Sequence, residues 1–366
     1  MKILHVVGAR PNFMKAGPVF EALATKNEFE QVLVHTGQHY DDNMSKVFFD
    51  ELRLPEPDFN LDVGSGSHAV QTAQIMMRME DALVEIRPHL VVVYGDVNST
   101  VAAALVCTKL LIPVAHVEAG LRSFDRKMPE EINRVLTDQM ADLLFTPSKE
   151  CNKNLLREGV AKERIHLVGN VMIDTLIRLL PESRVEASHS DRALVASGGP
   201  YALVTLHRPS NVDDLGVLAK ILTALEDVSS DLSVIFPMHP RTRIRLREHR
   251  IQIPENARIH VISPVGYVEF LALQRDATVV ITDSGGMQEE TTFLGVPCLT
   301  VRENTERPVT VEVGTNTIVG QDMDFLKEKV GQILKGEAKK GSIPPLWDGK
   351  AGRRIADTLS TWTAAR

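Results

Sequence analysis

Short apolar segments alternate with helical segments along the whole chain, and this alternation limits the possible folds more than any other feature. The apolar runs predict strands over residues 2–7, 31–35, 90–94, 114–117 and 143–146, and over 201–206, 232–236, 258–261, 278–282 and 298–300. Helical patterns lie between them, for example over 13–24, 68–86, 100–110 and 130–140. Strands that are apolar throughout and separated by helices are typical of parallel sheets covered on both faces.

The length and one change of composition predict two domains. A chain of 366 residues is long enough to form two separate hydrophobic cores. Glu, Ser, Gly and Pro accumulate over residues 181–200, where the apolar periodicity fades. We therefore expect two doubly wound α/β domains that meet at a cleft, over residues 1–175 and 176–348. A helical pattern near 349–366 predicts a last helix that packs back on the first domain.

Composition excludes several classes of function. The net charge of −7 argues against a nucleic-acid binder, and no apolar run approaches the ~20 residues that a membrane span needs. The chain begins directly with a strand pattern, so we expect no signal peptide, and three scattered cysteines fit a reducing cytoplasm. The sequence has no H-E-x-x-H motif, no Cys/His cluster and no Walker loop, so we expect no metal site.

One strand-to-helix junction predicts an anion site. The apolar run that ends at Thr282 is followed by Asp283 and then by Ser284, Gly285 and Gly286, which open a helical pattern. A helix N-terminus offers free N–H groups and the positive end of the dipole, and glycines let a phosphate approach the backbone. A Gly-Gly pair after a strand is also a common turn. Glu290, one turn further on, is placed to bind ribose hydroxyls.

Polar residues also follow the strands of the first half, where ligands bind in open α/β sheets. Arg10 and Lys15 come after the first strand, and cations at a helix start are unfavourable unless they bind something. Asp96 follows the third strand, where it is a candidate to act as a base or to bind sugar hydroxyls. Asp96 or Asn98 could also cap the helix expected from Thr100, and the two roles are compatible. Glu118 ends the fourth strand beside Ala119-Gly120.

The helix expected after Pro129 carries Glu130 and Glu131 in its first turn, where carboxylates are favourable for stability alone. Three acids, Asp96, Glu118 and Glu130, would allow proton transfer on two faces of a substrate if they converge.

In the second half, His207 follows the strand expected over 201–206, before the anion site in the sequence. Arg307 follows the strand expected over 298–300, after that site. Imidazole titrates near neutral pH, so His207 is a candidate to protonate or stabilise a leaving phosphate, and Arg307 to bind it. Phe270 is a candidate to stack on a base, although a lone Phe is more often part of a core.

Taken together, these segments resemble the UDP-N-acetylglucosamine 2-epimerase family, which has the two-Rossmann-domain GT-B type of fold. The resemblance runs from residue 8 to residue 308. It rests on six ordered motifs: Gly95-Asp96, His116-Val117-Glu118-Ala119-Gly120-Leu121-Arg122, Pro129-Glu130-Glu131 with Asn133-Arg134, His207-Arg208, Asp283-Ser284-Gly285-Gly286 through Glu290, and Glu306-Arg307-Pro308.

The resemblance implies interconversion of UDP-GlcNAc and UDP-ManNAc by elimination and re-addition of UDP, with no redox cofactor and in a homodimer. It implies that Asp96, Glu118, Glu130 and His207 are catalytic. The substrate-binding residues that it implies are Arg10, Lys15, Arg134, Phe270, Ser284, Gly285, Gly286, Glu290 and Arg307.

The sequence departs from the family at three places. Residues 38–44 lack the Arg and Glu that many bacterial members use for activation by UDP-GlcNAc, and Ser210 and Val309 stand where Glu is common. The last two changes bear on the sugar that is accepted, for example a 3-acetamido uronic acid analogue. The alternatives are a hydrolysing epimerase that releases ManNAc and UDP, a GT-B glycosyltransferase, and a nucleotide-sugar sensor without turnover.

Overall fold

The computed structural model describes residues 1–37, 52, 54–183, 199–249, 251–253 and 258–364, and divides the chain into two compact units. Unit 1 comprises Met1–Arg178 and Pro345–Arg366, and unit 2 comprises Leu179–Pro344. Most of the compositional break over residues 181–200 lies outside the described residues.

Unit 1 contains a sheet of seven strands in the order β3-β2-β1-β4-β5-β6-β7, and all described pairs are parallel. The strands are β1 (Lys2–Val7), β2 (Glu30–His35), β3 (Phe59–Asn60), β4 (Leu90–Tyr94), β5 (Val114–Val117), β6 (Leu143–Thr146) and β7 (Ile165–Leu167). The order reverses between β1 and β4, and in doubly wound sheets ligands bind at the carboxyl ends of the strands on either side of such a reversal.

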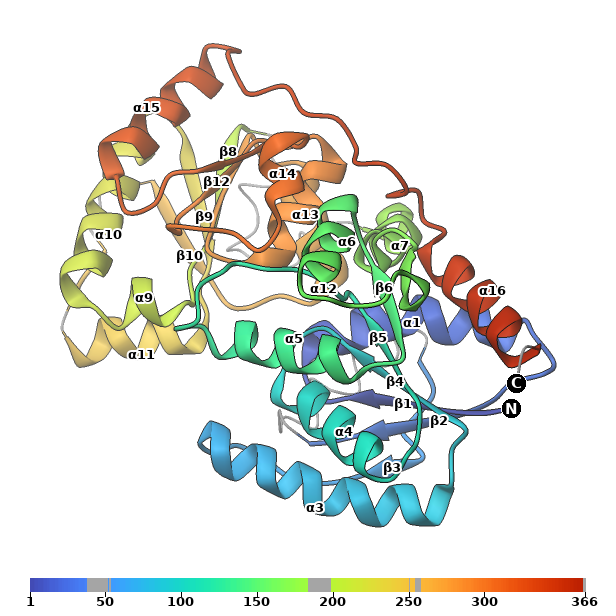
Figure 1. Cartoon of the computed structure of the whole chain (residues 1–366). Helices are drawn as coiled ribbons and strands as arrows, with labels where there is room; N and C mark the ends of the chain where they lie inside the picture. Colours follow the sequence, from blue (N-terminus) through green and yellow to red (C-terminus); the bar gives the residue numbers. More distant parts are fainter. Residues whose placement is uncertain (38–51, 53, 184–198, 250, 254–257, 365–366) are drawn as a thin grey trace. The chain divides into compact units, whose positions relative to one another are not determined.

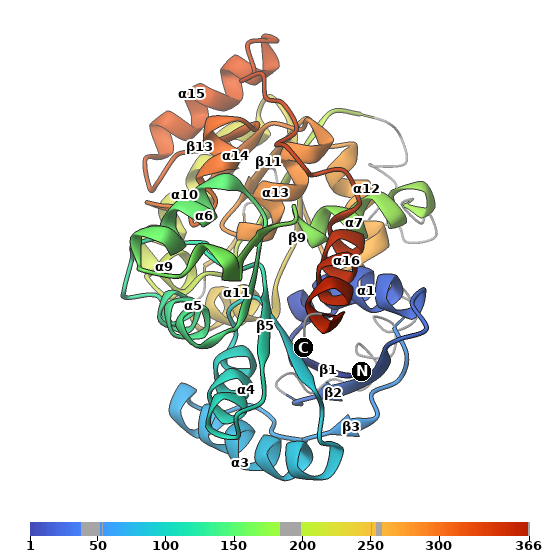
Figure 2. The same cartoon turned by 45° about the vertical axis from the view of Figure 1, so that its right-hand side comes forward.

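The helices of unit 1 cover both faces of this sheet. They are α1 (Arg10–Ala24), α3 (His68–Ile86), α4 (Asn98–Lys109), α5 (Pro129–Met140), α6 (Lys149–Arg157), α7 (Val171–Leu179) and α16 (Ala351–Ala364). Figure 1 shows α3 and α4 on one side of the strands, and α1 with α16 on the other. The last helix, α16, lies beside α1 (Figure 2), and both chain ends belong to unit 1.

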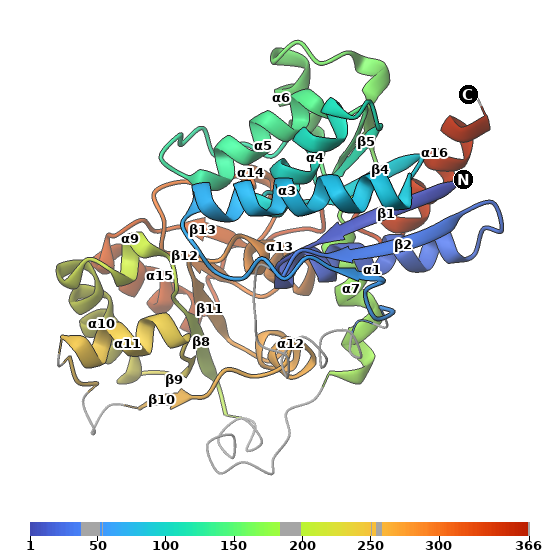
Figure 3. The ribbon, with the colours of Figure 1, turned by 90° about the horizontal axis from the view of Figure 1, so that it is seen from below.

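Unit 2 repeats the plan with a sheet of six strands in the order β10-β9-β8-β11-β12-β13, again parallel. The strands are β8 (Tyr201–Thr205), β9 (Ser233–Pro237), β10 (Ile259–Ile262), β11 (Val279–Thr282), β12 (Cys298–Thr300) and β13 (Asn316–Ile318). The helices are α9 (Pro209–Val212), α10 (Leu215–Ser229), α11 (Pro240–Glu248), α12 (Tyr267–Arg275), α13 (Gly285–Leu294), α14 (Pro308–Glu312) and α15 (Met323–Leu334). Figure 3 shows α10 and α11 on one side of the strands and α12 and α13 on the other.

The predicted fold class, two parallel-sheet α/β domains, is confirmed, with corrections at the sheet edges. The strands β3, β7 and β13 were not predicted, and each lies at the edge of its sheet. They have two or three residues and are only partly buried, so no continuous apolar run marks them. The core strands β4 and β5 are fully buried, as a strand between two helical layers requires.

Candidate functional site

The loop between β1 and α1 is fixed against the end of β4 by one buried side chain, Asn12. Its Oδ1 accepts hydrogen bonds from the backbone N–H groups of Gly8 (3.2 Å) and Ala9 (3.1 Å), and its Nδ2 donates to the carbonyl of Tyr94 (2.7 Å). The start of α1 is therefore held beside the carboxyl ends of β1 and β4. Arg10 is the first residue of this helix, but its side chain lies outside what the structure describes, so its role stays a prediction.

Lys15 of α1 forms a buried ion pair with Glu118, the residue that follows β5. Only 5% of Lys15 and 4% of Glu118 are exposed. The pair lies against Gly95, because a Cβ added there would be 2.7 Å from Lys15 Nζ and 3.2 Å from Glu118 Oε2. Three segments far apart in sequence thus bring one cation and one carboxylate together at the ends of β4 and β5.

The backbone of Glu118 is in the left-handed region, with φ of 74°. For a residue with a long side chain this conformation costs on the order of 1–3 kcal/mol, and such strain is concentrated at functional sites. The strain supports the prediction that Glu118 does more than pack.

Asp96 is held by two residues of α5. Arg134 donates from Nε to Asp96 Oδ2 (2.9 Å) and lies 2.8 Å from it through Nη2, while Asn133 Nδ2 donates to the Asp96 carbonyl (2.9 Å). The helix α4 begins at Asn98, with Val97 at the N-cap position, two residues before the predicted start at Thr100. The alternative that Asp96 or Asn98 caps this helix stays a prediction. Arg134 is almost fully buried, and its contact with substrate stays a prediction.

The two glutamates in the first turn of α5 differ in environment. Glu131 is buried and accepts hydrogen bonds from the N–H and hydroxyl of Ser123 (both 3.0 Å) and the N–H of Phe124 (2.9 Å), and it also pairs with Arg134. It therefore fixes the preceding loop. Glu130 is half-buried beside it, directly after Pro129 as predicted. Its part in catalysis stays a prediction.

In unit 2, Asp283 fixes the loop that carries His207. The carboxylate accepts from the N–H groups of His207 (3.0 Å) and Arg208 (2.9 Å) and from Asn211 Nδ2 (3.1 Å). It also lies 3.0 Å from Nδ1 of His207, whose side chain is 41% exposed. Burial acts to raise the pKa of Asp283, but His207 and the two backbone N–H groups outweigh it and lower that pKa. An ionised Asp283 therefore holds His207 with its Nδ1–H turned inward.

The Ser-Gly-Gly turn lies where the sequence predicts it, at the N-terminus of α13. Ser284 is the N-cap residue without a side-chain cap bond, and Gly285 begins the helix. A Cβ on Gly285 would overlap the carboxylate of Glu306 and come within 2.5 Å of Arg307 Nη1. Arg307 thus lies at this helix N-terminus. It also pairs with Glu289 (3.0 Å from Nε to Oε1).

The two residues predicted to bind the nucleoside lie on neighbouring helices of unit 2. Glu290 of α13 is buried and accepts a hydrogen bond of 2.8 Å from the hydroxyl of Tyr267 on α12. Phe270, one turn after Tyr267, is partly buried against the cluster of core residues beneath α12 and α13. Contact of either residue with a nucleoside stays a prediction.

Sequence reasoning missed Asp138, which is fully buried on α5 and pairs with His116. A signal for it was present. Glu131, Arg134 and Asp138 recur at spacings of three and four residues, which places three charges on one helix face, and the structure buries all three. Charged side chains that are buried on one face of a helix must bind other polar groups, so this face of α5 indicates a polar network near the strand ends.

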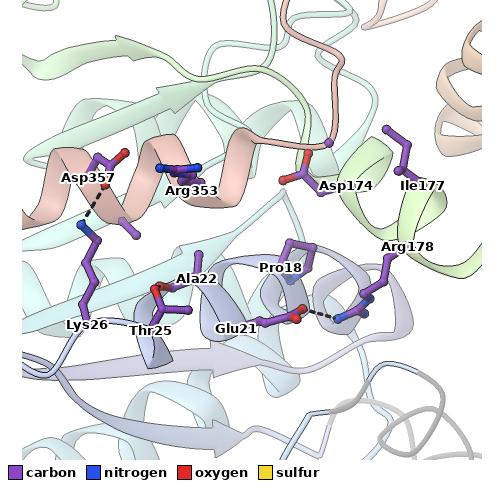
Figure 4. A pocket seen from close by; sticks show the side chains of 12 residues that line it. Pro18, Glu21, Ala22, Thr25, Lys26, Asp174, Ile177, Arg178, Arg353 and Asp357 are labelled. Atoms are coloured by element: carbon purple, nitrogen blue, oxygen red, sulfur yellow. Dashed lines mark hydrogen bonds and ion pairs between the residues drawn. The ribbon is translucent and has the colours of Figure 1, made fainter.

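A cavity of about 600 Å³ lies elsewhere in unit 1, among α1, α7 and α16 (Figure 4). Two ion pairs cross its wall, Lys26 with Asp357 (2.8 Å) and Arg178 with Glu21 (2.9 Å). None of the predicted site residues lines it. The candidate site therefore consists of the residues at the strand ends. Within the described ranges, no helix is long and apolar enough to span a membrane, and no three His, Cys, Asp or Glu side chains group as metal ligands.

Comparisons with known proteins agree with the family resemblance. A protein-family model described as UDP-N-acetylglucosamine 2-epimerase matches residues 21–360. The UDP-N-acetylglucosamine 2-epimerase of Methanococcus maripaludis is 44% identical over 98% of this chain and 98% of that protein. The UDP-2,3-diacetamido-2,3-dideoxy-D-glucuronate 2-epimerase of Pseudomonas aeruginosa is 41% identical over 98% of this chain and 99% of that protein.

Solved structures are similar over the whole chain. The crystal structure of Methanocaldococcus jannaschii UDP-GlcNAc 2-epimerase in complex with UDP-GlcNAc and UDP has a TM-score of 0.90 and 44% identity, and covers 99% of this chain and 100% of that chain. The Neisseria meningitidis enzyme bound to UDP-GlcNAc has a TM-score of 0.87 and 28% identity, with coverage of 99% and 100%.

Proposed function

Since the chain belongs to the UDP-N-acetylglucosamine 2-epimerase family, we propose that it interconverts UDP-GlcNAc and UDP-ManNAc without hydrolysis. The observation that carries this proposal is the buried pair of Lys15 with the strained Glu118, beside Gly95 and Asp96. The two carboxylates, Asp96 after β4 and Glu118 after β5, are each held by a buried cation. Two fixed carboxylates are suited to removing a proton from carbon and returning it. The Methanococcus maripaludis relative is named as an epimerase of this nucleotide sugar, and the Methanocaldococcus jannaschii structure contains it.

The chemistry requires that UDP departs first, because the C2 hydrogen of the sugar is barely acidic. The sugar then develops oxocarbenium character, which carboxylates stabilise. Asp96, Glu118 and Glu130 supply these carboxylates, and loss of the C2 proton gives 2-acetamidoglucal. Re-addition of UDP, with a proton delivered to the other face of C2, completes the inversion.

Unit 2 stabilises the departing diphosphate. The N-terminus of α13 at Ser284, Gly285 and Gly286 offers N–H groups and a favourable dipole, and Arg307 adds a cation. His207, which Asp283 holds through Nδ1, contributes a hydrogen bond from its other ring nitrogen. Arg10, whose side chain lies outside the described residues, is proposed as a further cation for the diphosphate. Glu290 binds the ribose, and Phe270 lies by the uracil.

A second substrate has a specific observation in its favour. The Pseudomonas aeruginosa relative that is named for a 2,3-diacetamido uronic acid sugar is nearly as similar to this chain as the archaeal UDP-GlcNAc enzymes. Ser210 and Val309 replace acidic residues common in the family, and a site with fewer carboxylates suits an anionic sugar. Regulation by UDP-GlcNAc depends on residues 38–44, which lie outside the described residues. A homodimer and a cytoplasmic location also stay predictions.

The test is product analysis after incubation of the purified protein with UDP-GlcNAc, using phosphorus NMR and anion-exchange chromatography. The proposal predicts UDP-ManNAc, with the sugar still attached to UDP. Free UDP and ManNAc would identify a hydrolysing epimerase, and transfer that requires an added acceptor would identify a glycosyltransferase. Turnover of the uronic acid analogue but not of UDP-GlcNAc would select the second substrate. Binding without turnover of either would indicate a sensor.

A further inference from the structure

His116 lies in the middle of the buried strand β5, and both of its ring nitrogens face oxygen atoms. Nδ1 is 2.7 Å from Asp138 Oδ1, and Nε2 is 2.8 Å from the carbonyl oxygen of Gly95. The side chains of His116 and Asp138 are fully buried.

The hydrogen bonds fix where the ring protons are. A backbone carbonyl only accepts, so Nε2 must carry a proton to bond to Gly95. The other oxygen of Asp138 accepts from the Gly120 N–H (3.0 Å) and lies 2.7 Å from Arg122 Nη2. Although burial opposes it, His116 and Arg122 lower the pKa of Asp138. An ionised Asp138 has no proton to give, so Nδ1 must carry one as well.

The charges around this ring balance only if it is a cation. Arg122 also binds Glu158 through two hydrogen bonds, of 2.8 Å from Nε and 2.6 Å from Nη2. With His116 and Arg122 positive and Asp138 and Glu158 negative, the cluster is neutral. The Glu158 side chain is 27% exposed, so solvent compensates part of its charge, whereas Asp138 is fully buried. A neutral imidazole would leave the cluster with a net negative charge around that buried carboxylate, which is unfavourable.

A second buried histidine of the same sheet shows the contrast. His5 on β1 is fully buried, and its Nδ1 faces the hydroxyl of Tyr94 at 2.7 Å rather than a carboxylate. Burial lowers the pKa of His5 to about 3, so this ring is neutral at physiological pH. Burial alone therefore does not explain a charged ring at His116. The Asp138 carboxylate does.

The two bonds of His116 fix the two loops that carry the candidate catalytic acids. The Gly95 carbonyl immediately precedes Asp96. Gly120, bound by Asp138, follows Glu118 by two residues, and the N–H groups of Glu118 and Ala119 both donate to the Phe145 carbonyl at 3.0 Å. Glu118 keeps its left-handed backbone conformation within this set of bonds.

We propose that His116 is a doubly protonated positioning residue, which together with Asp138 holds the Asp96 and Glu118 loops in place. It touches no reacting atom. The positioning effect rests on the proposed function, whereas the protonation state does not depend on it.

The protonation state is tested on the unmodified protein by NMR of ring-labelled histidines. At neutral pH, the ring of His116 should have both nitrogens protonated, as its two hydrogen-bond partners require. His5 in the same spectrum should show a single ring proton. Asp138→Asn should convert that ring to the form protonated on Nε2 alone, because the Asn amide donates to Nδ1. A His116 ring with one bare nitrogen in the unmodified protein at neutral pH would overturn the proposal.

The positioning effect is tested by kinetics. His116→Gln keeps a donor near Gly95 and His116→Asn keeps one near Asp138, so each removes one of the two bonds. Each should lower kcat about tenfold or more, as misplacement of catalytic groups does, while KM for UDP-GlcNAc and the Kd of UDP stay within about threefold. His166→Gln, on the edge strand β7 of the same sheet, is the matched control and should retain kcat.

Unchanged kcat in both His116 variants would overturn the positioning effect. If the unmodified protein turns over no UDP-GlcNAc, the proposed function fails, and the NMR result still decides the charge of His116.

Discussion

Asp174 on α7 is a buried carboxylate that the fold stabilises in its protonated form, and Asp174→Asn should therefore change how stability depends on pH. Only 8% of the residue is exposed, and its Oδ2 accepts a hydrogen bond of 2.8 Å from the N–H of Gly352, at the start of α16. Burial raises the pKa of Asp174 to about 6 from 3.8, against the lowering effect of that N–H group. Asparagine keeps an oxygen to accept the same bond.

The size of the effect follows from the shift. A difference of about two pKa units is worth about 3 kcal/mol, at 1.36 kcal/mol for each unit. The folded pKa is raised, so the folded state holds more protons than the unfolded state between about pH 4 and about pH 6. The contribution of Asp174 to the free energy of unfolding therefore falls as the pH rises through this window and is flat above it. Asp174→Asn removes that fall.

Tryptophan fluorescence during urea unfolding measures this change. The chain has two tryptophans, Trp347 and Trp362, and both belong to unit 1 with Asp174. From about pH 4.5 to about pH 8, the stability of Asp174→Asn relative to the unmodified protein should rise by about 2 kcal/mol. Asp357→Asn, an exposed acid on the same cavity, controls for the loss of one charge. A stability difference that is the same at every pH would refute the reasoning.

The remaining predictions concern the candidate site. Asp96→Asn and Glu118→Gln should each lower turnover by about 10² to 10⁴, which is the range for loss of a general acid or base. The affinity for UDP, measured by calorimetry, should be retained. Turnover rates near that of the unmodified protein would remove both residues from the mechanism. Gly285→Ala should weaken UDP binding at least about tenfold, because the new Cβ collides with Glu306 and Arg307. Gly331→Ala on α15, where a Cβ has open space, should bind UDP normally, and equal affinities in the two variants would contradict the assignment.

The sequence was sufficient for the fold class because the buried strands have continuous apolar runs. Leu90–Tyr94 and Val114–Val117 match the prediction residue for residue, since helices cover them on both faces. Edge strands such as Asn316–Ile318 are short and partly exposed, so hydrogen bonding to a neighbour defines them rather than composition. The helix expected from Thr100 begins two residues earlier, at Asn98. The prediction left Asn98 and Ser99 out because they are polar, but the structure buries both side chains in the first turn of the helix.

The candidate site was predictable in part. The position of each strand end indicated Asp96, Glu118 and the Ser284–Gly286 turn, because loops after parallel strands meet at one sheet edge. The pairing of Lys15 with Glu118 was not predictable, since it depends on how α1 passes the end of β5. The left-handed backbone of Glu118 and the doubly bonded ring of His116 are likewise results of tertiary packing, which no local pattern encodes.

The central claim, epimerisation through cleavage of the C2–H bond, is tested most directly by proton NMR of the protein with UDP-GlcNAc in D₂O. The account predicts that UDP-ManNAc appears with deuterium at C2, and that the C2 proton signal of the remaining UDP-GlcNAc declines as the reaction reverses. Formation of UDP-ManNAc that retains the C2 proton would contradict the mechanism built on Asp96 and Glu118.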